Sequence, residues 1–442
     1  MKTTTPDWRG TIALAVILGL APASITHAGD WPALGRDSSR NAATPEKGAP
    51  TDWQIQKPAR DKTPAQLAKN VRWEARLGSN NLASPVVAGG LVWVGTNNDV
   101  PRDPKKKEDA AVLMCFRETD GKFLWQYVSP RLDSEHEDFD RNSLNCSPLA
   151  EGDRLYFTTN RGDVVCLDIA ALRAGKGEPR VVWKLDTRKE LGVRLWAYSM
   201  LGKFTCSIGP SYKGRLYVTT GNGTGENSKI VPASKAPSLV CLDAKTGKVL
   251  WSDASPGKGI MLAQWSSPLV AEVKGKGQVI AAQGDGWLRS FDALTGKLLW
   301  KFDLNPKKAT PYKVGGGGER NFPLATPVLY ENRVYIATGQ EIDDGPNVGH
   351  LWCIDITKTP KNEAKDLSPV GDDFDPKSKV NADSALVWHY GGLVVPKPKG
   401  DESEWVFGRT MSNVAVHDGL VIAPELGTFR EWPGPGSFIV RL

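Results

Sequence analysis

Short runs of apolar residues, separated by turns that contain glycine, recur along this chain. The segment SPVVAGGLVWVGT at 84–96 places one apolar run on each side of a Gly-Gly pair. Two runs of strand length around a tight turn predict a β-hairpin. Matching segments begin at Ser147, Ser207, Ser267, Thr326 and Ser412.

A second segment follows the first and ends in tryptophan. It reads VCLDAKTGKVLW at 240–251, SFDALTGKLLW at 290–300 and MCFRETDGKFLW at 114–125, with looser copies over 166–183 and 353–388. The Thr-Gly or Asp-Gly pair supplies the positive φ that a hairpin turn requires, so this segment predicts a second hairpin. The tryptophans and turn glycines that occupy repeated positions are Trp73, Trp125, Trp183, Trp251, Trp300, Trp388, Gly121, Gly247 and Gly296.

The two hairpins together form a unit that returns about every sixty residues. Four antiparallel strands repeated at a regular interval, with no helical periodicity between them, predict the blades of an all-β propeller. A β-solenoid is the alternative, although its repeats are usually shorter and lack the terminal tryptophan. We expect each repeat tryptophan to pack against the neighbouring sheet and to set the angle between blades.

The composition is that of a soluble globular protein, with 40% hydrophobic and 24% charged residues in a chain of 442. The net charge of +6 comes from 56 basic and 50 acidic residues that are spread along the chain. No basic stripe interleaved with aromatic residues is present, which argues against nucleic-acid binding.

The first residues have the pattern of a secretory signal. Lys2 and Arg9 precede an apolar run that ends in Thr26-His-Ala28, and we expect cleavage after Ala28. The run is short for a transmembrane helix. Because no cysteine lies near the cleavage point, we expect no lipoprotein anchor. We therefore expect a periplasmic or secreted protein. Its expected parts are a signal peptide (1–28), an extended segment (29–70), a propeller (71–426) and an atypical tail (427–442).

The six cysteines fall into repeated positions rather than pairs. Four of them, at 115, 166, 241 and 353, share one slot of the repeat, and Cys146 and Cys206 share another. Equivalent positions of different repeats lie far apart, whereas a disulfide requires Cα atoms within about 7 Å. We expect buried free thiols, and a Cys146–Cys206 bridge is the alternative.

The motif CLDAKTGKVLW at 241–251 resembles the repeat of the PQQ-like β-propeller family. This family includes quinoprotein dehydrogenases and the B component of the outer-membrane assembly machine. The resemblance covers residues 71–426 and implies a ring of about eight blades. For an enzyme it also implies PQQ with calcium. The dehydrogenases commonly carry two adjacent cysteines and a catalytic carboxylate. This chain has no adjacent cysteines and no acidic residue that aligns with those roles, so we expect no cofactor and no catalysis.

One acidic stretch contains candidate metal ligands. Asp138, Asp140 and Asn142 have the spacing that begins a calcium loop, but the sixth position is Ser143 and the twelfth is Leu149. An EF-hand has glycine and glutamate at these two positions, so the EF-hand interpretation fails. A solvated acidic loop is the simpler interpretation.

Loop lengths distinguish the two faces of the predicted propeller. The turns within each hairpin are tight, as at Gly89-Gly90 and Thr246-Gly247, and share one face. The longer insertions, at 97–110, 126–144, 221–237, 301–320, 340–349 and 357–382, share the other. Long loops on a rigid scaffold commonly carry binding sites. We therefore expect a non-enzymatic scaffold that binds a protein or cell-envelope component through the long-loop face. A quinoprotein-type dehydrogenase is the alternative, and carbohydrate binding is a third class.

The repeat is incomplete at both ends. Residues 71–75 resemble a fourth strand with its Trp73, and we expect them to complete the last blade. The sixth unit begins at Ser412 and has no copy of the CLDAKTG turn after residue 427. A truncation or frameshift near Phe429 is one hypothesis. The alternative is a closed six-bladed ring in which residues 438–442 supply the third strand.

Overall fold

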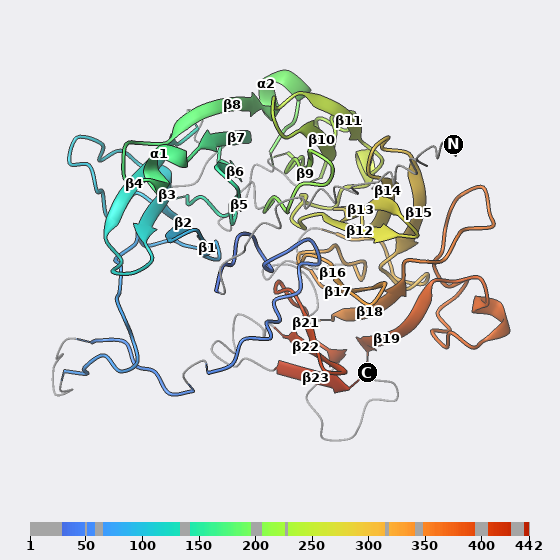
Figure 1. Cartoon of the computed structure of the whole chain (residues 1–442). Helices are drawn as coiled ribbons and strands as arrows, with labels where there is room; N and C mark the ends of the chain where they lie inside the picture. The colour runs from blue at the N-terminus through green and yellow to red at the C-terminus, as the bar shows by residue number, and fades with distance from the viewer. Residues whose placement is uncertain are drawn as a thin grey trace, which may run out of the picture.

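The computed structural model describes residues 29–48, 51–57, 65–132, 142–195, 206–225, 229–313, 318–340, 348–393, 405–425 and 437–441. Within these ranges, six antiparallel sheets follow one another in chain order around a common centre (Figure 1). Each strand pairs with the next one along the chain, as in the blades of a propeller. The predicted all-β propeller is confirmed.

Three sheets have four strands each. The first contains β1 (Val86–Ala88), β2 (Leu91–Asn97), β3 (Ala110–Arg117) and β4 (Phe123–Pro130). The second contains β5 (Leu149–Glu151), β6 (Arg154–Thr158), β7 (Asp163–Asp168) and β8 (Arg180–Asp186), with the short helices α1 (Ala170–Arg173) and α2 (Thr187–Leu191). The fourth contains β12 (Leu269–Val273), β13 (Lys276–Ala282), β14 (Trp287–Asp292) and β15 (Leu298–Asp303).

The other sheets depart from four strands. The third contains β9 (Arg215–Thr219), β10 (Leu239–Asp243) and β11 (Val249–Asp253). The fifth contains β16 (Val328–Tyr330), β17 (Arg333–Thr338), β18 (His350–Asp355), β19 (Leu386–Leu393) and β20 (Trp405–Phe407). The sixth contains β21 (Ala415–His417), β22 (Leu420–Pro424) and β23 (Ser437–Arg441). Two 3-10 turns lie at Gly257–Gly259 and Lys379–Asn381.

The segments at the two ends of the repeated region differ in whether they form strands. Residues 71–75 form no strand, so the predicted fourth strand there is wrong. In the sixth sheet β23 pairs with β22, which places residues 437–441 in the third-strand position. This pairing matches the alternative hypothesis, in which the C-terminal residues supply the third strand of the sixth blade.

A β-bulge recurs between the third and fourth strands of the blades. The bulge follows Cys115, Cys166, Cys241, Ser290 and Cys353, and each of these residues lies directly opposite the repeat tryptophan. A small side chain leaves room for the indole across the strand pair, and the bulge increases the local twist. The repeated Cys-to-Trp spacing in the sequence is thus a cross-strand pair.

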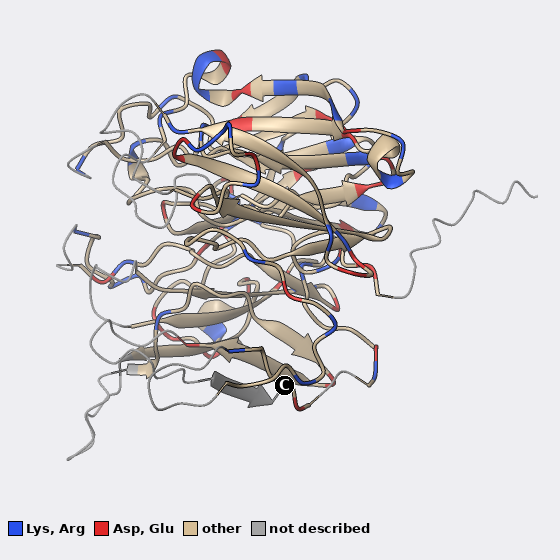
Figure 2. Ribbon diagram, turned by 90° about the vertical axis from the view of Figure 1, so that its left-hand side faces the viewer, with Lys and Arg blue, Asp and Glu red and all other residues tan. Residues whose placement is uncertain are grey.

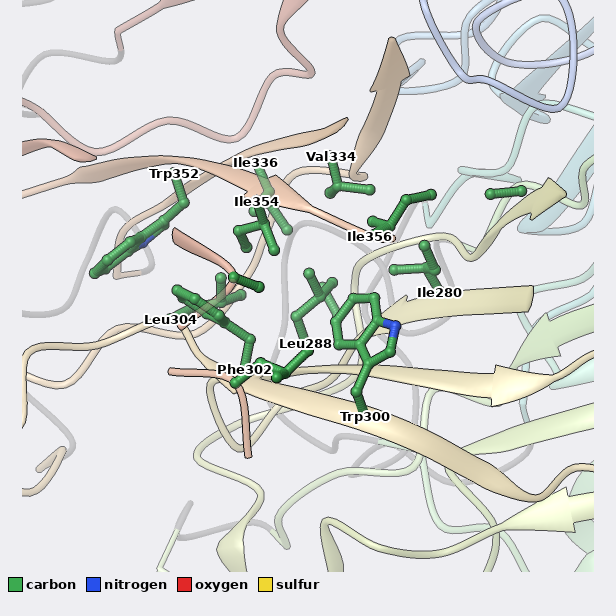
Figure 3. Packing of buried hydrophobic residues seen from close by; sticks show 14 of the residues in the cluster. Ile280, Leu288, Trp300, Phe302, Leu304, Val334, Ile336, Trp352, Ile354 and Ile356 are labelled. Carbon is green, nitrogen blue, oxygen red and sulfur yellow. The ribbon is translucent and has the colours of Figure 1, made fainter. Parts of the chain in front are cut away.

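The core lies between neighbouring blades as well as within them. One cluster joins the fourth and fifth sheets, where aromatic and branched side chains of β14 and β15 face those of β17 and β18 (Figure 3). Its labelled members are Ile280, Leu288, Trp300, Phe302, Leu304, Val334, Ile336, Trp352, Ile354 and Ile356. Burial of apolar surface at such junctions holds adjacent blades together. Figure 2 shows basic and acidic residues interspersed over the strands and loops.

Candidate functional site on the long-loop face

Three repeat tryptophans occupy the same place on the next blade. The indole Nε1 atoms of Trp183 and Trp251 donate to the carbonyl oxygens of Ala244 (3.1 Å) and Ala293 (3.2 Å). A Cβ atom at Gly247 would lie 2.6 Å from Trp183, and one at Gly296 would lie 2.6 Å from Trp251. The turn glycine therefore serves two purposes, because it adopts a positive φ and also leaves a flat surface for the indole.

Trp73 makes the same contact with the first blade. Its indole donates to the carbonyl oxygen of Glu118 (2.7 Å), and a Cβ atom at Gly121 would lie 2.5 Å from its ring. Trp73 thus lies on the first sheet as Trp183 lies on the third, although its own segment forms no strand.

The remaining repeat tryptophans lack such a glycine. Trp125 packs edge-on against Trp93 with ring centroids 6.2 Å apart, and Trp388 lies 6.0 Å from Tyr335. Trp300 is buried and donates to Oε1 of Gln278 (3.1 Å). In the blades that follow Trp125 and Trp300, the Thr-Gly turn is replaced by α1 or by the long segment 357–382. Because 357–382 connects β18 to β19, it lies on the face of the tight turns, and its predicted place on the long-loop face is wrong. The contacts of all six repeat tryptophans are with other residues of the propeller, so we assign these side chains a structural role.

All six cysteines are buried free thiols, as expected. Burial raises the pKa of Cys146, Cys241 and Cys353 to about 12, so none of these is a thiolate at neutral pH. The Cys146 thiol donates to the carbonyl oxygen of Thr158 (3.0 Å). No bridge joins Cys146 and Cys206.

The candidate metal ligands are only partly described. Asp138 and Asp140 lie outside the described residues, and Asn142 is buried. No group of three or more His, Cys, Asp or Glu side chains suited to a metal occurs in the described part of the chain.

A chain of hydroxyl groups runs around the central channel. The backbone amide of Ser147 donates to Oγ of Ser207 (2.9 Å), and the amide of Ser207 donates to Oγ of Ser267 (2.9 Å). The amide of Ser267 donates to Oγ1 of Thr326 (3.1 Å), whose own amide donates to Oδ1 of Asn413 (2.8 Å). Each of these side chains precedes the first strand of its blade. This ladder therefore joins successive blades at the inner end of the long-loop face.

The N-terminal segment crosses the channel beside this ladder (Figure 1). Its residues bond to the innermost strands of several blades: Trp31 to Val87, Pro32 to Ala150, Ser39 to Leu329 and Asn41 to Val416. Four different sheets are connected in this way.

Arg40 anchors the same segment to the middle blades. Its guanidinium is fully buried and donates to the carbonyl oxygens of Ser207 (2.7 Å) and Pro268 (2.8 Å). Desolvation lowers the pKa of Arg40 to about 10, which leaves the group charged at neutral pH. A Cβ atom at Gly209 would lie 2.6 Å from Nη2, so glycine is required beside the guanidinium.

The central cavity, of about 650 Å³, lies between the N-terminal segment and the long-loop face. Leu34, Gly35 and Ala42 of the segment contribute to its lining. The rest of the lining comes from ladder residues, from other polar residues and from apolar side chains. It includes Ser147, Ser207, Ser267, Thr326, Ser84, Asn145, Glu425, Trp265, Leu324 and Met411. A cavity of this size with an apolar lining and convergent hydroxyl groups is typical of ligand sites.

A second pocket, the lateral pocket, has a volume of about 550 Å³ and lies beside the third and fourth blades. Its lining comes from three long loops and from the short turn between β13 and β14, and it includes Thr224, Lys229, Lys258, Met261, Asp285, Tyr312, Lys313 and Arg320. Asp285 is held by Arg289 through two hydrogen bonds, of 2.9 and 2.6 Å. The unneutralised charge of the lining is therefore positive.

One apolar cluster separates the two pockets. Leu262, Ala263, Trp265, Phe322 and Leu324 form its buried part, and Met261, Tyr312 and Met411 pack against it. Trp265, Leu324 and Met411 line the central cavity, whereas Met261 and Tyr312 line the lateral pocket. The two pockets are thus the two sides of one wall.

Neither pocket has the ligand set of a calcium-bound quinone. Calcium takes six to eight oxygen ligands, usually with several carboxylates. In the described lining, Glu425 is the one carboxylate of the central cavity and Asp285 that of the lateral pocket. Arg289 already neutralises Asp285, and the neighbouring lysines repel a divalent cation.

The family model described as outer membrane protein assembly factor BamB matches residues 67–173 and 172–322. The chain belongs to the PQQ-like β-propeller repeat family. Within this family it is similar to the quinohemoprotein alcohol dehydrogenase ADH IIB of Pseudomonas putida, with 37% identity over 226 residues. It is also similar to the dehydrogenase subunit of alcohol dehydrogenase (quinone) from Gluconobacter oxydans (strain 621H), with 30% identity over 181 residues.

These similarities to dehydrogenases are partial. The match to the Pseudomonas enzyme covers 43% of this chain and 29% of the enzyme, and the match to the Gluconobacter subunit covers 39% and 21%. Among solved structures, quinohemoprotein alcohol dehydrogenase from Comamonas testosteroni has a TM-score of 0.49 and 15% identity, over 90% of this chain and 57% of that one. BamB from Moraxella catarrhalis has a TM-score of 0.32 and 15% identity, over 76% and 79%.

The structure adds several residues of this PQQ-like propeller that its repeat did not single out. Arg40 is outside the repeat, and the lateral pocket combines residues from separate insertions. The ladder had a sequence signal, because four of its members, Ser147, Ser207, Ser267 and Thr326, begin copies of the segment that is repeated from 84–96. No helix of the described residues is long and apolar enough to span a membrane.

Proposed function

We propose that this chain is a periplasmic or secreted, non-enzymatic binding module that holds a protein or cell-envelope component on its long-loop face. The observation that carries the proposal is the pair of pockets on that face, which share one apolar wall. Two adjoining pockets offer a partner an apolar contact, a row of hydroxyl groups and a group of cations within one surface. The opposite face carries tight turns such as Thr246-Gly247, the segment 357–382 and a pocket of about 510 Å³ whose lining includes Lys245.

The chemistry of the central cavity supports binding rather than catalysis. Its ladder hydroxyls accept hydrogen bonds from backbone amides, so their acceptor capacity is partly used in holding blades together. Activation of a serine nucleophile requires an adjacent base. The described lining contains no histidine and no lysine to act as one.

A face-resolved crosslinking experiment tests this proposal. A photoreactive residue is placed at Met411, beside the central cavity, or at Lys245, in a tight turn of the opposite face. Both full-length variants are then irradiated with isolated bacterial cell envelopes. We expect discrete adducts from position 411 and none from position 245. Equal labelling from both positions would contradict a partner-binding long-loop face.

The second candidate function is a quinoprotein-type dehydrogenase, which the sequence similarity to two alcohol dehydrogenases favours. Incubation with PQQ and calcium, followed by absorbance spectroscopy and dye reduction with a primary alcohol, distinguishes the two. A bound-quinone spectrum together with alcohol-dependent dye reduction would establish the enzyme and overturn the binding-module proposal.

A further inference from the structure

The lateral pocket contains two lysines that have no partner among the residues that the structure describes. Lys258 and Lys313 line the pocket and form no ion pair with the residues that the structure describes. The carboxylate in the lining, Asp285, accepts a two-point contact from Arg289. It is therefore not available to neutralise these lysines.

Arg320 also lines the pocket and is held in place. Its Nη2 and Nη1 atoms donate to Oδ1 (2.8 Å) and Oδ2 (3.4 Å) of the buried Asp303, which balances its charge, and its carbonyl oxygen accepts from Gln340 (3.0 Å). A guanidinium fixed in this way presents its remaining N–H groups in a set direction, which suits a planar oxyanion.

Thr224 provides an independent observation. It lines the pocket and is 2% exposed, and its hydroxyl Oγ1 has no hydrogen-bond partner among the described residues. Its backbone amide is already used, because it donates to the carbonyl oxygen of Leu262 (2.8 Å). A buried hydroxyl without a partner is unfavourable unless a water or a ligand atom satisfies it.

Tyr312 adds an aromatic surface to this charged lining. Its ring packs edge-on against the buried Phe322, with centroids 5.6 Å apart and an interplanar angle of 90°. The ring is half-buried, so it is held while part of it stays exposed. A volume of about 550 Å³ falls in the range of small-molecule sites.

We propose that the lateral pocket is an oxyanion subsite that takes a carboxylate or sulfate group of an acidic saccharide, with Lys258, Lys313 and Arg320 facing the anion and Tyr312 beneath the sugar ring. Thr224 donates its hydroxyl hydrogen to an oxygen of the same ligand. This inference rests on the proposed binding role of the long-loop face and narrows its partner to an acidic glycan.

Calorimetric titration of the full-length chain tests the subsite. The probes are trigalacturonate, neutral cellotriose and inorganic sulfate. We expect trigalacturonate to bind, with a Kd that rises with salt, and cellotriose not to bind. Sulfate should bind at least tenfold more weakly than trigalacturonate. Equal affinity for sulfate and trigalacturonate would overturn the saccharide assignment, and no binding of either would overturn the site.

Matched variants locate the binding. Replacing both Lys258 and Lys313 by glutamine should weaken trigalacturonate binding at least tenfold, whereas Lys245→Gln with Lys248→Gln, in a tight turn of the opposite face, should leave it unchanged. Thr224→Val should also weaken binding without lowering the unfolding midpoint of the free chain. Equal loss in both lysine pairs would place the binding outside the pocket.

The outcome is separable from that of the broader proposal. Face-specific crosslinking from Met411 combined with no trigalacturonate binding would reject the acidic glycan and keep the binding face. Trigalacturonate binding that depends on Lys258 and Lys313, without envelope crosslinking from Met411, would keep the subsite and reject the envelope partner.

Discussion

The Nη2 atom of Arg40 lies 2.8 Å from the carbonyl oxygen of Pro268, although 228 positions separate the two residues. The same nitrogen also donates to Ser207, which belongs to the preceding blade. One side chain of the N-terminal segment thus bonds to two blades at the channel, where the hydroxyl ladder already joins them.

Replacing Arg40 by methionine should lower the free energy of unfolding by about 3 kcal/mol, because the carbonyl groups of Ser207 and Pro268 would be buried without their donor. Urea unfolding followed by tryptophan fluorescence measures the change. Arg180→Met is the control, since the Arg180 side chain is 82% exposed, and its effect should stay within about 0.5 kcal/mol. Equal effects of the two changes would show that the buried guanidinium does not stabilise the channel.

Loss of one ladder hydroxyl should destabilise a blade junction. In Ser267→Ala the buried amide of Ser207 loses its acceptor, and we expect a loss of about 1–3 kcal/mol in urea unfolding. Ser255→Ala serves as the comparison, because the exposed Ser255 hydroxyl bonds only to the nearby Asp253 among the described residues. A Ser267→Ala protein as stable as Ser255→Ala would rule out a stabilising role for the ladder.

Two glycines with the same backbone conformation allow the energetic cost of the indole contact to be distinguished from that of turn strain. Gly247 and Gly214 both have φ near +74°, but a Cβ atom would meet Trp183 at Gly247 and nothing within 4 Å at Gly214. Gly214→Ala should cost about 1 kcal/mol through backbone strain alone. Gly247→Ala should cost at least about 2 kcal/mol, because the indole must also move. Thermal unfolding of both variants measures the difference, and equal costs would refute a tight indole–glycine contact.

A buried histidine and its half-buried neighbour should make the fifth blade sensitive to acid. Nδ1 of His350 and Nε2 of His389 lie 2.9 Å apart, and the ring of Phe374 lies 4.2 Å from that of His389. Burial lowers the pKa of His350 to about 4 and that of His389 to about 3, from 6.5. The unfolded chain therefore takes up more protons than the folded chain as the pH falls below 6.5.

The free energy of unfolding should accordingly fall from pH 6.5 towards pH 4, by up to about 1.4 kcal/mol per pH unit for each histidine. Urea unfolding at a series of pH values tests this. Replacing both histidines by glutamine should flatten the dependence, whereas replacing the half-exposed His417 should not. An unchanged slope in the double variant would assign the acid sensitivity to other groups.

The sequence allowed prediction of whatever the repeat itself encodes. The hairpins and the buried cysteines follow from the spacing, because each copy of the repeat can be compared with the others. The division of loops between the two faces also follows from it, except for 357–382, which joins the third and fourth strands of its blade. The strand at 71–75 was predicted wrongly: Trp73 carries the indole contact of a fourth strand, but its neighbours pair with no third strand. The role of Arg40 could not be predicted, because a single arginine outside the repeat has no equivalent copy to compare it with. The lateral pocket could not be predicted either, because Lys258, Thr224 and Lys313 come together only after three separate loops fold.

The hydroxyl ladder contains no information about how many blades the protein has. Three of the four hydrogen bonds use the same groups, so a duplicated unit would find an amide on one side and a hydroxyl on the other. Gene duplication could lengthen such a series without any new interface. The N-terminal segment behaves differently, since residues 31–41 must reach fixed partners from Val87 to Val416 across the channel. The length of this segment, and not the repeat, therefore limits how far apart the blades that it contacts can lie around the channel.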